Sequence, residues 1–361
     1  MVTFFINDIS GRGGTERVTC SIANMLATQG EFPIEILSLH QTKLKTIFDL
    51  SPNIPAHTLF NEAGHGITRF PATWLRLHKY LKTHKVDILV DVDGILDLYS
   101  FPAAIGTSTK IISWEHFNYF SNPTVPYRKL SRPLAGRFAS ALVTLTEKDK
   151  QNYLDNLKHR KSPVISITNP MPPFQKHPYN VESRTIVSAG RLTDQKGFDL
   201  LLESAFQVLP KHPDWQWYIL GEGEDRKKLE KMVNDYGLSA QVHLPGMVKI
   251  DDYLKDASFF VLSSRYEGLG MVLLEAKAHH LPLISFDCEI GPAEIIENGV
   301  NGILVPPEDT DALAHAVEKF IDSPSLRQQY SDKSEQGSER FQPEYILNQW
   351  TNLLRHIQNE Q

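Results

Sequence analysis

Two glutamates, Glu267 and Glu275, stand in residues 263–277, the segment of the chain with the most potential for chemistry. The segment follows an apolar run and opens a predicted helix, and Gly268 and Gly270 let the backbone approach a ligand closely. The amino end of a helix offers free N–H groups to an anion, and a carboxylate suits two sugar hydroxyls. We expect Glu267 at the rim of the loop. The spacing leaves a second interpretation open: a capping glutamate and a structural ion pair.

A second stretch, residues 187–198, ends a predicted strand, turns at Gly190 and begins a helix after Gly197. Arg191 and Lys196 stand on either side of this turn and can point into one pocket. The planar fork of an arginine and the point charge of a lysine together suit a diphosphate, and they stabilise negative charge on a leaving diphosphate. Taken alone, the pattern also fits two solvated surface cations.

Glycines also crowd residues 11–17, between a strand and a helix, as in loops that cradle phosphate. The stretch has no Gly-x4-Gly-Lys-Ser/Thr, so it is not a P-loop, and Glu16 breaks the dinucleotide-binding pattern. His116 follows a strand and is a candidate to meet the substrate, although a lone histidine is often structural. We interpret Asp91 and Asp93 as polar residues at a strand end, and we expect no essential metal.

The elements that would position these residues follow an α/β pattern. Strands are predicted at residues 2–7, 32–39, 86–90, 110–114 and 141–144, with helices between them. A proline-rich seam near residues 162–180 interrupts this order, and strand–helix alternation then restarts at Thr185. We therefore predict two Rossmann-like domains facing across a deep cleft, residues 1–168 and 169–342. Residues 343–361 are predicted to form a helix that packs back toward the first domain.

Composition sets further limits. The 361 residues are 41% hydrophobic and 22% charged, which is typical of a globular protein. Cys20 and Cys288 are too few for a disulfide scaffold or a cysteine zinc site. The apolar run at residues 2–6 is too short for a signal peptide, and no run is long enough to span a membrane. We expect a cytoplasmic protein. The net charge of −6 argues against nucleic-acid binding.

The charge differs between the predicted domains. Residues 1–168 contain 19 Lys/Arg and 14 Asp/Glu, whereas residues 169–361 contain 18 and 29. The positive first domain is a candidate for an anionic surface or acceptor, and drift in surface composition is the other interpretation.

Taken in order, these segments resemble the family 4 glycosyltransferases, which have two Rossmann domains in the GT-B arrangement. The resemblance covers nearly the whole chain. It depends on the order of Gly13-Gly14-Thr15-Glu16, Glu115-His116, Gly190-Arg191 with Lys196-Gly197, Gly221-Glu-Gly-Glu224, Leu244-Pro-Gly246, Glu267-x7-Glu275 and Asn301-Gly-Ile-Leu-Val305. Within the family the chain looks most like bacterial enzymes that extend capsule, exopolysaccharide or lipid-linked oligosaccharide.

The resemblance implies a role for each candidate residue. It makes Glu267, His116, Lys196 and Arg191 the catalytic set. Arg191 and Lys196 hold the diphosphate of a nucleotide sugar, together with Gly14 from the first domain. It also implies that Glu267 and His116 contact the donor sugar, and that Gly270, Met271 and Val272 give backbone contacts. In the same resemblance, Glu275 contacts the ribose, and Met247 and Val248 contact the base.

The resemblance further implies a retaining transferase. The acceptor hydroxyl enters on the side of the leaving group, and no carboxylate pair for double displacement is required. We expect transfer of a hexose or N-acetylhexosamine from a UDP-sugar to a lipid-linked saccharide acceptor in surface polysaccharide synthesis.

Basic and aromatic residues alternate in residues 69–85 and 127–137 of the first domain. Such helices can lie on an anionic membrane surface, which predicts peripheral attachment to the inner face of the membrane. An ordinary helix with solvated basic residues is the alternative. The set comprises Arg69, Arg76, Lys79, Lys82, Lys85, Phe70, Trp74, Leu77, Leu81, Arg128, Lys129, Arg132 and Arg137.

Two other functions stay open from the sequence. Sugar-nucleotide epimerases with two Rossmann domains need acid and base groups near C2 of the sugar, and Glu267 with His116 could supply them. A non-catalytic glycan- or nucleotide-sugar-binding protein is the third possibility.

Overall fold

A computed structural model describes residues 1–43, 46–64, 66–121 and 126–359. The chain divides into two compact units. The N-terminal unit contains Met1–Pro170 and Pro343–Gln361, and the C-terminal unit contains Met171–Gln342. The predicted arrangement of the two domains across a cleft stays a prediction.

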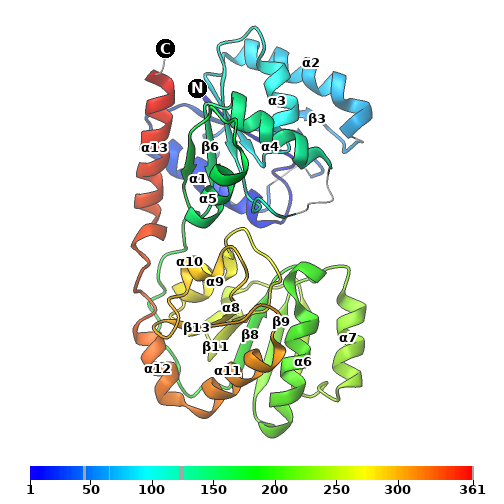
Figure 1. Ribbon diagram of the computed structural model, residues 1–361, viewed down its shortest axis with the longest axis vertical. Coiled ribbons are helices and arrows are strands. Elements are labelled where there is room, and N and C mark those ends of the chain that lie inside the picture. The colour runs from blue at the N-terminus through cyan, green and yellow to red at the C-terminus, as the bar shows by residue number, and fades with distance from the viewer. Residues whose placement is uncertain (44–45, 65, 122–125, 360–361) are drawn as a thin grey trace. The chain divides into compact units, whose positions relative to one another are not determined.

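The N-terminal unit is built on a parallel sheet in the order β3-β2-β1-β4-β5-β6-β7 (Figure 1). The central strands are apolar and buried because helices cover both faces of a parallel sheet. Strand β3, at one edge, has a half-exposed and mixed sequence. The strands are Val2–Ile6 (β1), Ile34–His40 (β2), Ala56–Phe60 (β3), Ile88–Val92 (β4), Lys110–Trp114 (β5), Ala141–Thr144 (β6) and Val164–Ser166 (β7).

Helices connect these strands. Helix α1 begins after Gly13 and ends at Gly30, whose φ of 76° is the left-handed conformation common at helix ends. Pro71 lies in the second turn of α2, where it has no N–H to donate to the carbonyl four residues earlier. The helices are Gly14–Gln29 (α1), Gly66–His84 (α2), Asp97–Ala104 (α3), Pro126–Phe138 (α4) and Glu147–Asn156 (α5).

The C-terminal unit has the same type of architecture, with a parallel sheet in the order β10-β9-β8-β11-β12-β13. Its strands are Thr185–Ala189 (β8), Gln216–Leu220 (β9), Val242–Gly246 (β10), Phe259–Leu262 (β11), Leu283–Phe286 (β12) and Gly302–Val305 (β13). Its helices are Phe198–Val208 (α6), Arg226–Asp235 (α7), Asp251–Leu254 (α8), Met271–Ala278 (α9), Pro292–Ile295 (α10), Thr310–Asp322 (α11) and Pro324–Asp332 (α12).

The last helix, α13 (Pro343–Asn359), belongs to the N-terminal unit. Its buried Trp350 packs edge-on against Trp114 and Phe4, with ring centroids 4.8 and 6.2 Å apart. Thr351 donates a hydrogen bond to Gln29, and Arg355 pairs with Glu31. An apolar stripe thus holds the end of the chain against the first sheet.

The two predicted parallel-sheet α/β domains are confirmed. Within them, the predicted strands 110–114, 141–144, 185–189 and 283–286 have the observed bounds. No helix among the described residues is long and apolar enough to span a membrane.

Candidate active site

The two central strands of the C-terminal sheet, β8 and β11, define where a site can form. The chain proceeds outward from β8 to β9 and β10, and then crosses to β11 on the other side of β8. In open parallel sheets, ligands bind at this change of direction, beyond the carboxyl ends of the strands. The loop after β8 contains Arg191 and Lys196, and the loop after β11 contains Glu267. The topology therefore brings the two sequence motifs to one place.

Lys196 and Glu267 make direct contact there. The Lys196 ammonium donates a hydrogen bond of 2.5 Å to Oε1 of Glu267, which also accepts a 2.6 Å bond from the Ser264 hydroxyl. Glu267 is only 5% exposed, whereas we expected it at the loop rim. The ion pair that the sequence left open thus exists, and it joins the two predicted motifs.

Glycines allow the loop after β8 to lie close to the loops after β11 and β9. Gly197 has a φ of 60°, and a Cβ atom there would overlap the Ser263 carbonyl oxygen. Gly221 has a φ of 136°, and a Cβ atom there would overlap the carbonyl oxygen of Gly190. Only glycine fits both the backbone conformation and the space at these positions.

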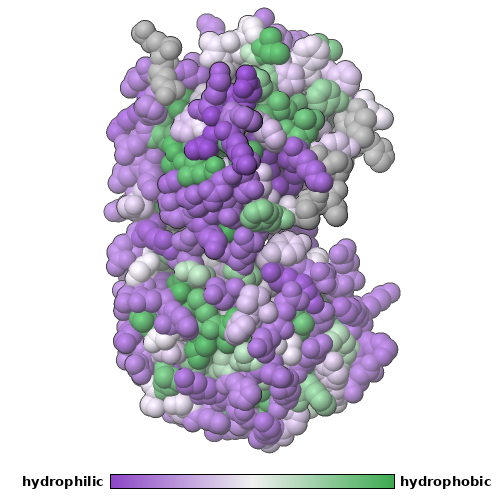
Figure 2. All heavy atoms as spheres, in the orientation of Figure 1, coloured by the Kyte–Doolittle hydropathy of each residue, from purple (hydrophilic) through white to green (hydrophobic). Residues whose placement is uncertain are grey.

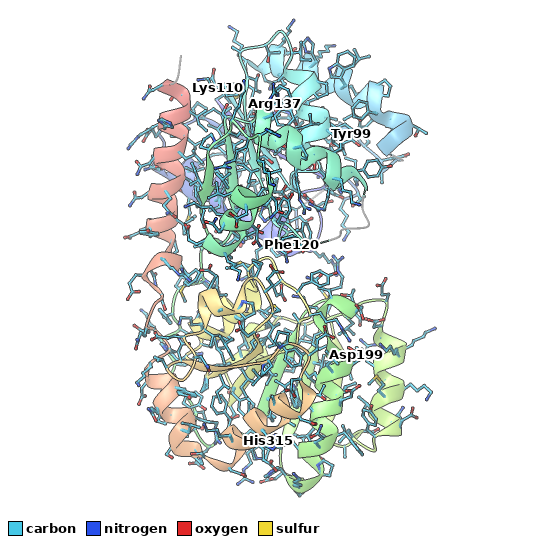
Figure 3. The ribbon with its side chains drawn as sticks, viewed as in Figure 1. Tyr99, Lys110, Phe120, Arg137, Asp199 and His315 are labelled. Atoms are coloured by element: carbon cyan, nitrogen blue, oxygen red, sulfur yellow. The ribbon has the colours of Figure 1, made fainter. Side chains whose placement is uncertain are left out.

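Further contacts fix the loops next to the ion pair. The Gln195 side chain donates to the Tyr266 carbonyl (3.0 Å), and the Arg265 N–H donates to the Gln195 carbonyl (2.9 Å). Arg265 also forms a two-pronged ion pair, 2.9 and 3.0 Å, with Asp199. Figure 3 shows the position of Asp199 on α6. Burial opposes ionisation of Asp199, but Arg265 and Lys228 outweigh it and lower the pKa to about 2. The loops are thereby held in one conformation.

Helix α9 starts within this loop region. Gly270 precedes it with a φ of 89°, and Met271 and Val272 are its first residues, so their N–H groups belong to its first turn. Glu275 follows one turn later and is buried. Arg191, Met247 and Val248 are exposed, at the ends of β8 and β10. All the predicted residues of this unit therefore lie at the same sheet edge.

In the N-terminal unit, the glycine loop leads into α1 as predicted. The Glu16 carboxylate lies over this loop, since Cβ atoms on Gly11 and Gly13 would be 2.6 Å from its oxygens. A carboxylate at the amino end of a helix is favourable. Gly14 has open space where a side chain would be.

His116 lies just beyond the carboxyl end of β5, and its ring contacts Trp114 with centroids 4.3 Å apart. It is 9% exposed, and its Nε2 atom has no hydrogen-bond partner among the described residues. Burial lowers the pKa of His116 to about 3, so the imidazole is neutral at physiological pH.

The sequence did not predict a charged cluster that lies next to His116. Arg128 donates two hydrogen bonds, 2.9 and 2.8 Å, to Asp93, and lies 3.6 Å from Glu115. Asp93 has a φ of 89°, rare for a residue with a side chain. Arg132 is also buried and bonds to Tyr153 and Asn118. The expectation that Arg128 and Arg132 face a membrane is therefore wrong, because internal carboxyl, hydroxyl and carbonyl groups hold them.

Asp91 and Asp97 form a second buried pair. The Ser100 hydroxyl donates to Asp91 and the Ser113 hydroxyl to Asp97, each at 2.7 Å, and the charges of the two carboxyls interact. Burial raises the pKa of Asp91 to about 7, and burial and the Asp91 charge raise the pKa of Asp97 well above its ordinary value. Two buried carboxyls that interact titrate as a pair, and both keep their protons to a higher pH than a free carboxyl does.

Comparison with known proteins identifies the family. Residues 173–337 match the family described as "Glycosyl transferases group 1". A protein of Haemophilus influenzae named as a glycosyltransferase is 33% identical over 98% of this chain and 99% of its own length. The chain belongs to the group 1 glycosyl transferases.

Two further similarities place this glycosyltransferase among its relatives. It is 29% identical to the amylovoran biosynthesis glycosyltransferase AmsD of Erwinia amylovora, over 97% of this chain and 98% of that protein. The pneumococcal O-GlcNAc transferase GtfA, whose structure was solved with UDP and GlcNAc, has the same fold. Its TM-score is 0.84 at 13% identity, and the match covers 100% of this chain and 99% of that one.

The buried Asp91–Asp97 pair predicts a pH dependence of the transferase's stability. Because the folded carboxyls keep protons that the unfolded chain releases above pH ~4, stability falls as the pH rises from about 4 through 7. The slope is about 1.4 kcal/mol per pH unit for each extra proton held. Asp97→Asn keeps the hydrogen bonds and removes one titrating group, so its melting temperature should fall less between pH 5 and 8.

Calorimetry of the wild type, Asp97→Asn and the exposed control Asp155→Asn over this range tests the prediction. Identical slopes for the wild type and Asp97→Asn would show that the pair does not hold the extra proton.

Proposed function

We propose that this glycosyltransferase transfers a hexose or N-acetylhexosamine from a UDP-sugar to a lipid-linked saccharide during synthesis of a surface polysaccharide, with retention of configuration. The observation that carries the proposal is the Lys196–Glu267 pair at the carboxyl edge of the second sheet. The relative named for amylovoran biosynthesis and the neighbour solved with UDP and GlcNAc support the product class and the donor. The epimerase and the binding protein are less favoured, because the family and these relatives are glycosyltransferases.

The cations of the loop after β8 suit the diphosphate of the donor. An ammonium has three N–H donors, so Lys196 can bond to Glu267 and to a phosphate oxygen together. Exposed Arg191 presents a second, forked cation. These charges stabilise the diphosphate as the bond to the sugar breaks. We infer that the reaction needs no metal ion, since these side chains supply the positive charge.

The loop after β11 suits the sugar and the ribose. In the proposed complex, Glu267 accepts hydrogen bonds from donor-sugar hydroxyls, and the N–H groups of Gly270, Met271 and Val272 line the same edge. Glu275 accepts the ribose hydroxyls, and exposed Met247 and Val248 lie against the base. The sugar-binding carboxylate is held in place beforehand by Lys196 and Ser264, which lowers the cost of ordering it on binding.

The first domain contributes Gly14 and His116 to the proposed reaction. Open space at Gly14 permits close approach of the diphosphate. His116, neutral because its pKa is about 3, acts as an uncharged hydrogen-bond partner of the sugar and not as a cation. The acceptor hydroxyl attacks C1 of the donor sugar from the side of the leaving diphosphate and forms the new glycosidic bond. The bond between C1 and the diphosphate oxygen breaks, and the hydroxyl proton goes to a diphosphate oxygen.

Turnover of site variants tests the proposal. Lys196→Ala and Glu267→Ala should each lower kcat/KM by about 10²–10³, because each removes charge next to the reacting bond. Glu275→Ala should mainly raise the Kd for UDP. The assay measures UDP release from UDP-sugars with lipid-linked acceptors, with and without EDTA, and NMR of the product reports its anomeric configuration.

Lys231→Ala, an exposed change in the same unit, is the matched control, and circular dichroism checks that each variant is folded. Wild-type rates in both folded site variants would refute the site. A donor sugar altered without any acceptor would instead support the epimerase.

We also propose that the N-terminal unit attaches to an anionic membrane surface through α2 and α4. Trp74 and Leu75 on α2 and Leu130 and Phe138 on α4 are exposed, and Figure 2 shows hydrophobic side chains among hydrophilic ones over this part of the surface. The exposed basic residues that remain for this role are Arg76, Lys79, Lys82, Lys85, Lys129 and Arg137. Such a mixture suits the interface of an anionic bilayer.

Flotation with vesicles tests the attachment. The wild type should float with vesicles that contain phosphatidylglycerol and not with pure phosphatidylcholine. The double variant Trp74→Ser and Leu75→Ser should float several-fold less, while Phe206→Ser, an exposed change in the other unit, should match the wild type. Recovery that does not depend on anionic lipid would contradict the proposal.

A further inference from the structure

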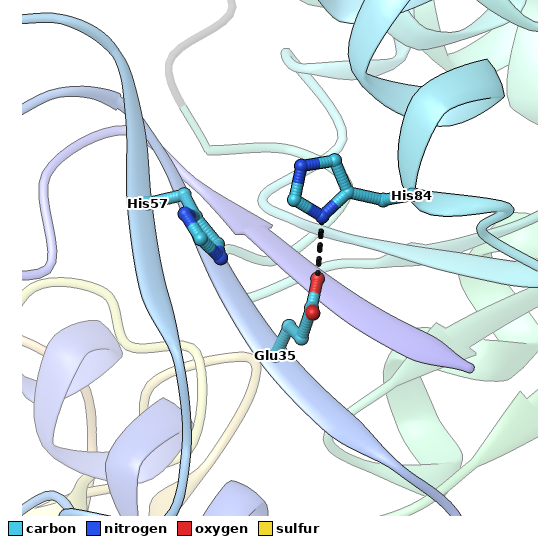
Figure 4. A group of neighbouring side chains, drawn as sticks. All are labelled: Glu35, His57 and His84. Atoms are coloured by element: carbon cyan, nitrogen blue, oxygen red, sulfur yellow. Dashed lines mark ion pairs between the residues drawn. The ribbon is translucent and has the colours of Figure 1, made fainter.

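Three potential metal ligands converge in the N-terminal unit, away from the residues discussed above. They are Glu35 on β2, His57 on β3 and His84, the last residue of α2 (Figure 4). One ligand atom from each lies within 4.8 Å of the other two. Oε2 of Glu35 and Nδ1 of His84 are 3.5 Å apart.

The topology explains why these residues meet. In the parallel register of β2 and β3, Leu37 lies opposite His57, so Glu35, two residues before Leu37, shares the sheet face of His57. Helix α2 covers this face, with Leu77 and Leu81 packed in the same core as Leu37. The helix returns antiparallel to the strands, so its last residue lies near the amino ends of β2 and β3.

This position separates the cluster from the residues that are proposed to take part in the transfer. The glycine loop and His116 follow the carboxyl ends of β1 and β5 in the same sheet, and the cluster lies toward the opposite, amino-terminal edge. An ion here would join edge strand β3 to β2 and α2 without touching the reacting groups.

Tyr80, one turn before His84, orients the three side chains. Its hydroxyl donates a 2.8 Å hydrogen bond to Oε2 of Glu35. Its ring stacks on His84 with centroids 4.0 Å apart, and lies edge-on to His57 at 5.7 Å. Groups that hold the ligands in this way are typical of the surroundings of metal sites.

We propose that Glu35, His57 and His84 bind one Zn²⁺ ion, with water as the fourth ligand. Two imidazoles and one carboxylate are a donor set that zinc prefers. Bonds of about 2.0–2.1 Å in tetrahedral geometry place ligand atoms roughly 3.3 Å apart. The Glu35–His84 separation of 3.5 Å is close to this value, and rotation of side chains at the helix end and the sheet edge can close the others.

The ion stabilises the fold and has no part in the transfer. It joins β3, an edge strand with a mixed and half-exposed sequence, to the end of α2. The expectation that transfer needs no metal concerns the donor site and is independent of this cluster.

Zinc titration of the untagged, EDTA-treated full chain tests the proposal. Calorimetry should give one Zn²⁺ per chain, and Co²⁺ in its place should show the visible absorption of a tetrahedral site. Zinc should raise the melting temperature of the wild type by several degrees, because it binds only the folded state. His57→Ala should weaken binding by at least about 100-fold and abolish the thermal shift.

His159→Ala, an exposed change in the same unit, should behave as the wild type. Glu35→Gln keeps an acceptor for Tyr80 and should still lose the zinc, which separates loss of a ligand from loss of the fold. Equal melting temperatures in EDTA confirm that the variants are folded. Absence of saturable zinc binding, or unchanged affinity in His57→Ala and Glu35→Gln, would overturn the proposal.

Discussion

A lysine and a glutamate of opposite charge hold together the two loops on which the donor site depends. Glu267 is almost fully buried, and Lys196 is mostly buried. Either charge alone would be costly in this position, because burial removes its hydration. Together, at 2.5 Å, they offset that cost and fix the distance between the ends of β8 and β11. The start of α9, and with it Gly270 and Glu275, takes its position from the same loop.

The parallel sheet explains why this pair forms where it does. The carboxyl ends of all strands meet at one edge, and the reversal of strand order between β8 and β11 leaves room between their loops. The N-terminal unit follows the same rule, with its reversal between β1 and β4. Its polar groups gather at the carboxyl ends of β4 and β5, where Arg128 joins Asp93 and Glu115. Each sheet thus has a cluster of charged residues at the edge where function is expected.

The sequence predicted the architecture well, because buried parallel strands are short apolar runs that are easy to delimit. Strand β3 escaped notice because its sequence, Ala-His-Thr-Leu-Phe, mixes polar and apolar residues at a half-exposed edge. The loops with Lys196 and Glu267 were found from their glycines and charges. Their contact was not predicted, since 71 residues separate the partners and only the strand order brings them together.

Burial of charge was the property that local sequence predicted least well. Arg128 and Arg132 have the pattern of basic residues on an exposed helix face, and the structure instead turns them toward Asp93 and Tyr153. Glu267 was expected at a rim and lies inside. In each case the partner comes from a distant segment, and no spacing rule within a helix or loop reveals it.

Hydrogen exchange measured by mass spectrometry, with and without UDP, tests the central claim most directly, because it locates the nucleotide without requiring turnover. The account predicts slower exchange in the peptides that cover residues 190–197, 246–248 and 263–276. It predicts no change in the peptides of α11 and α12, which contain none of the predicted donor-site residues. Binding of UDP with protection elsewhere, and none in these loops, would contradict the account.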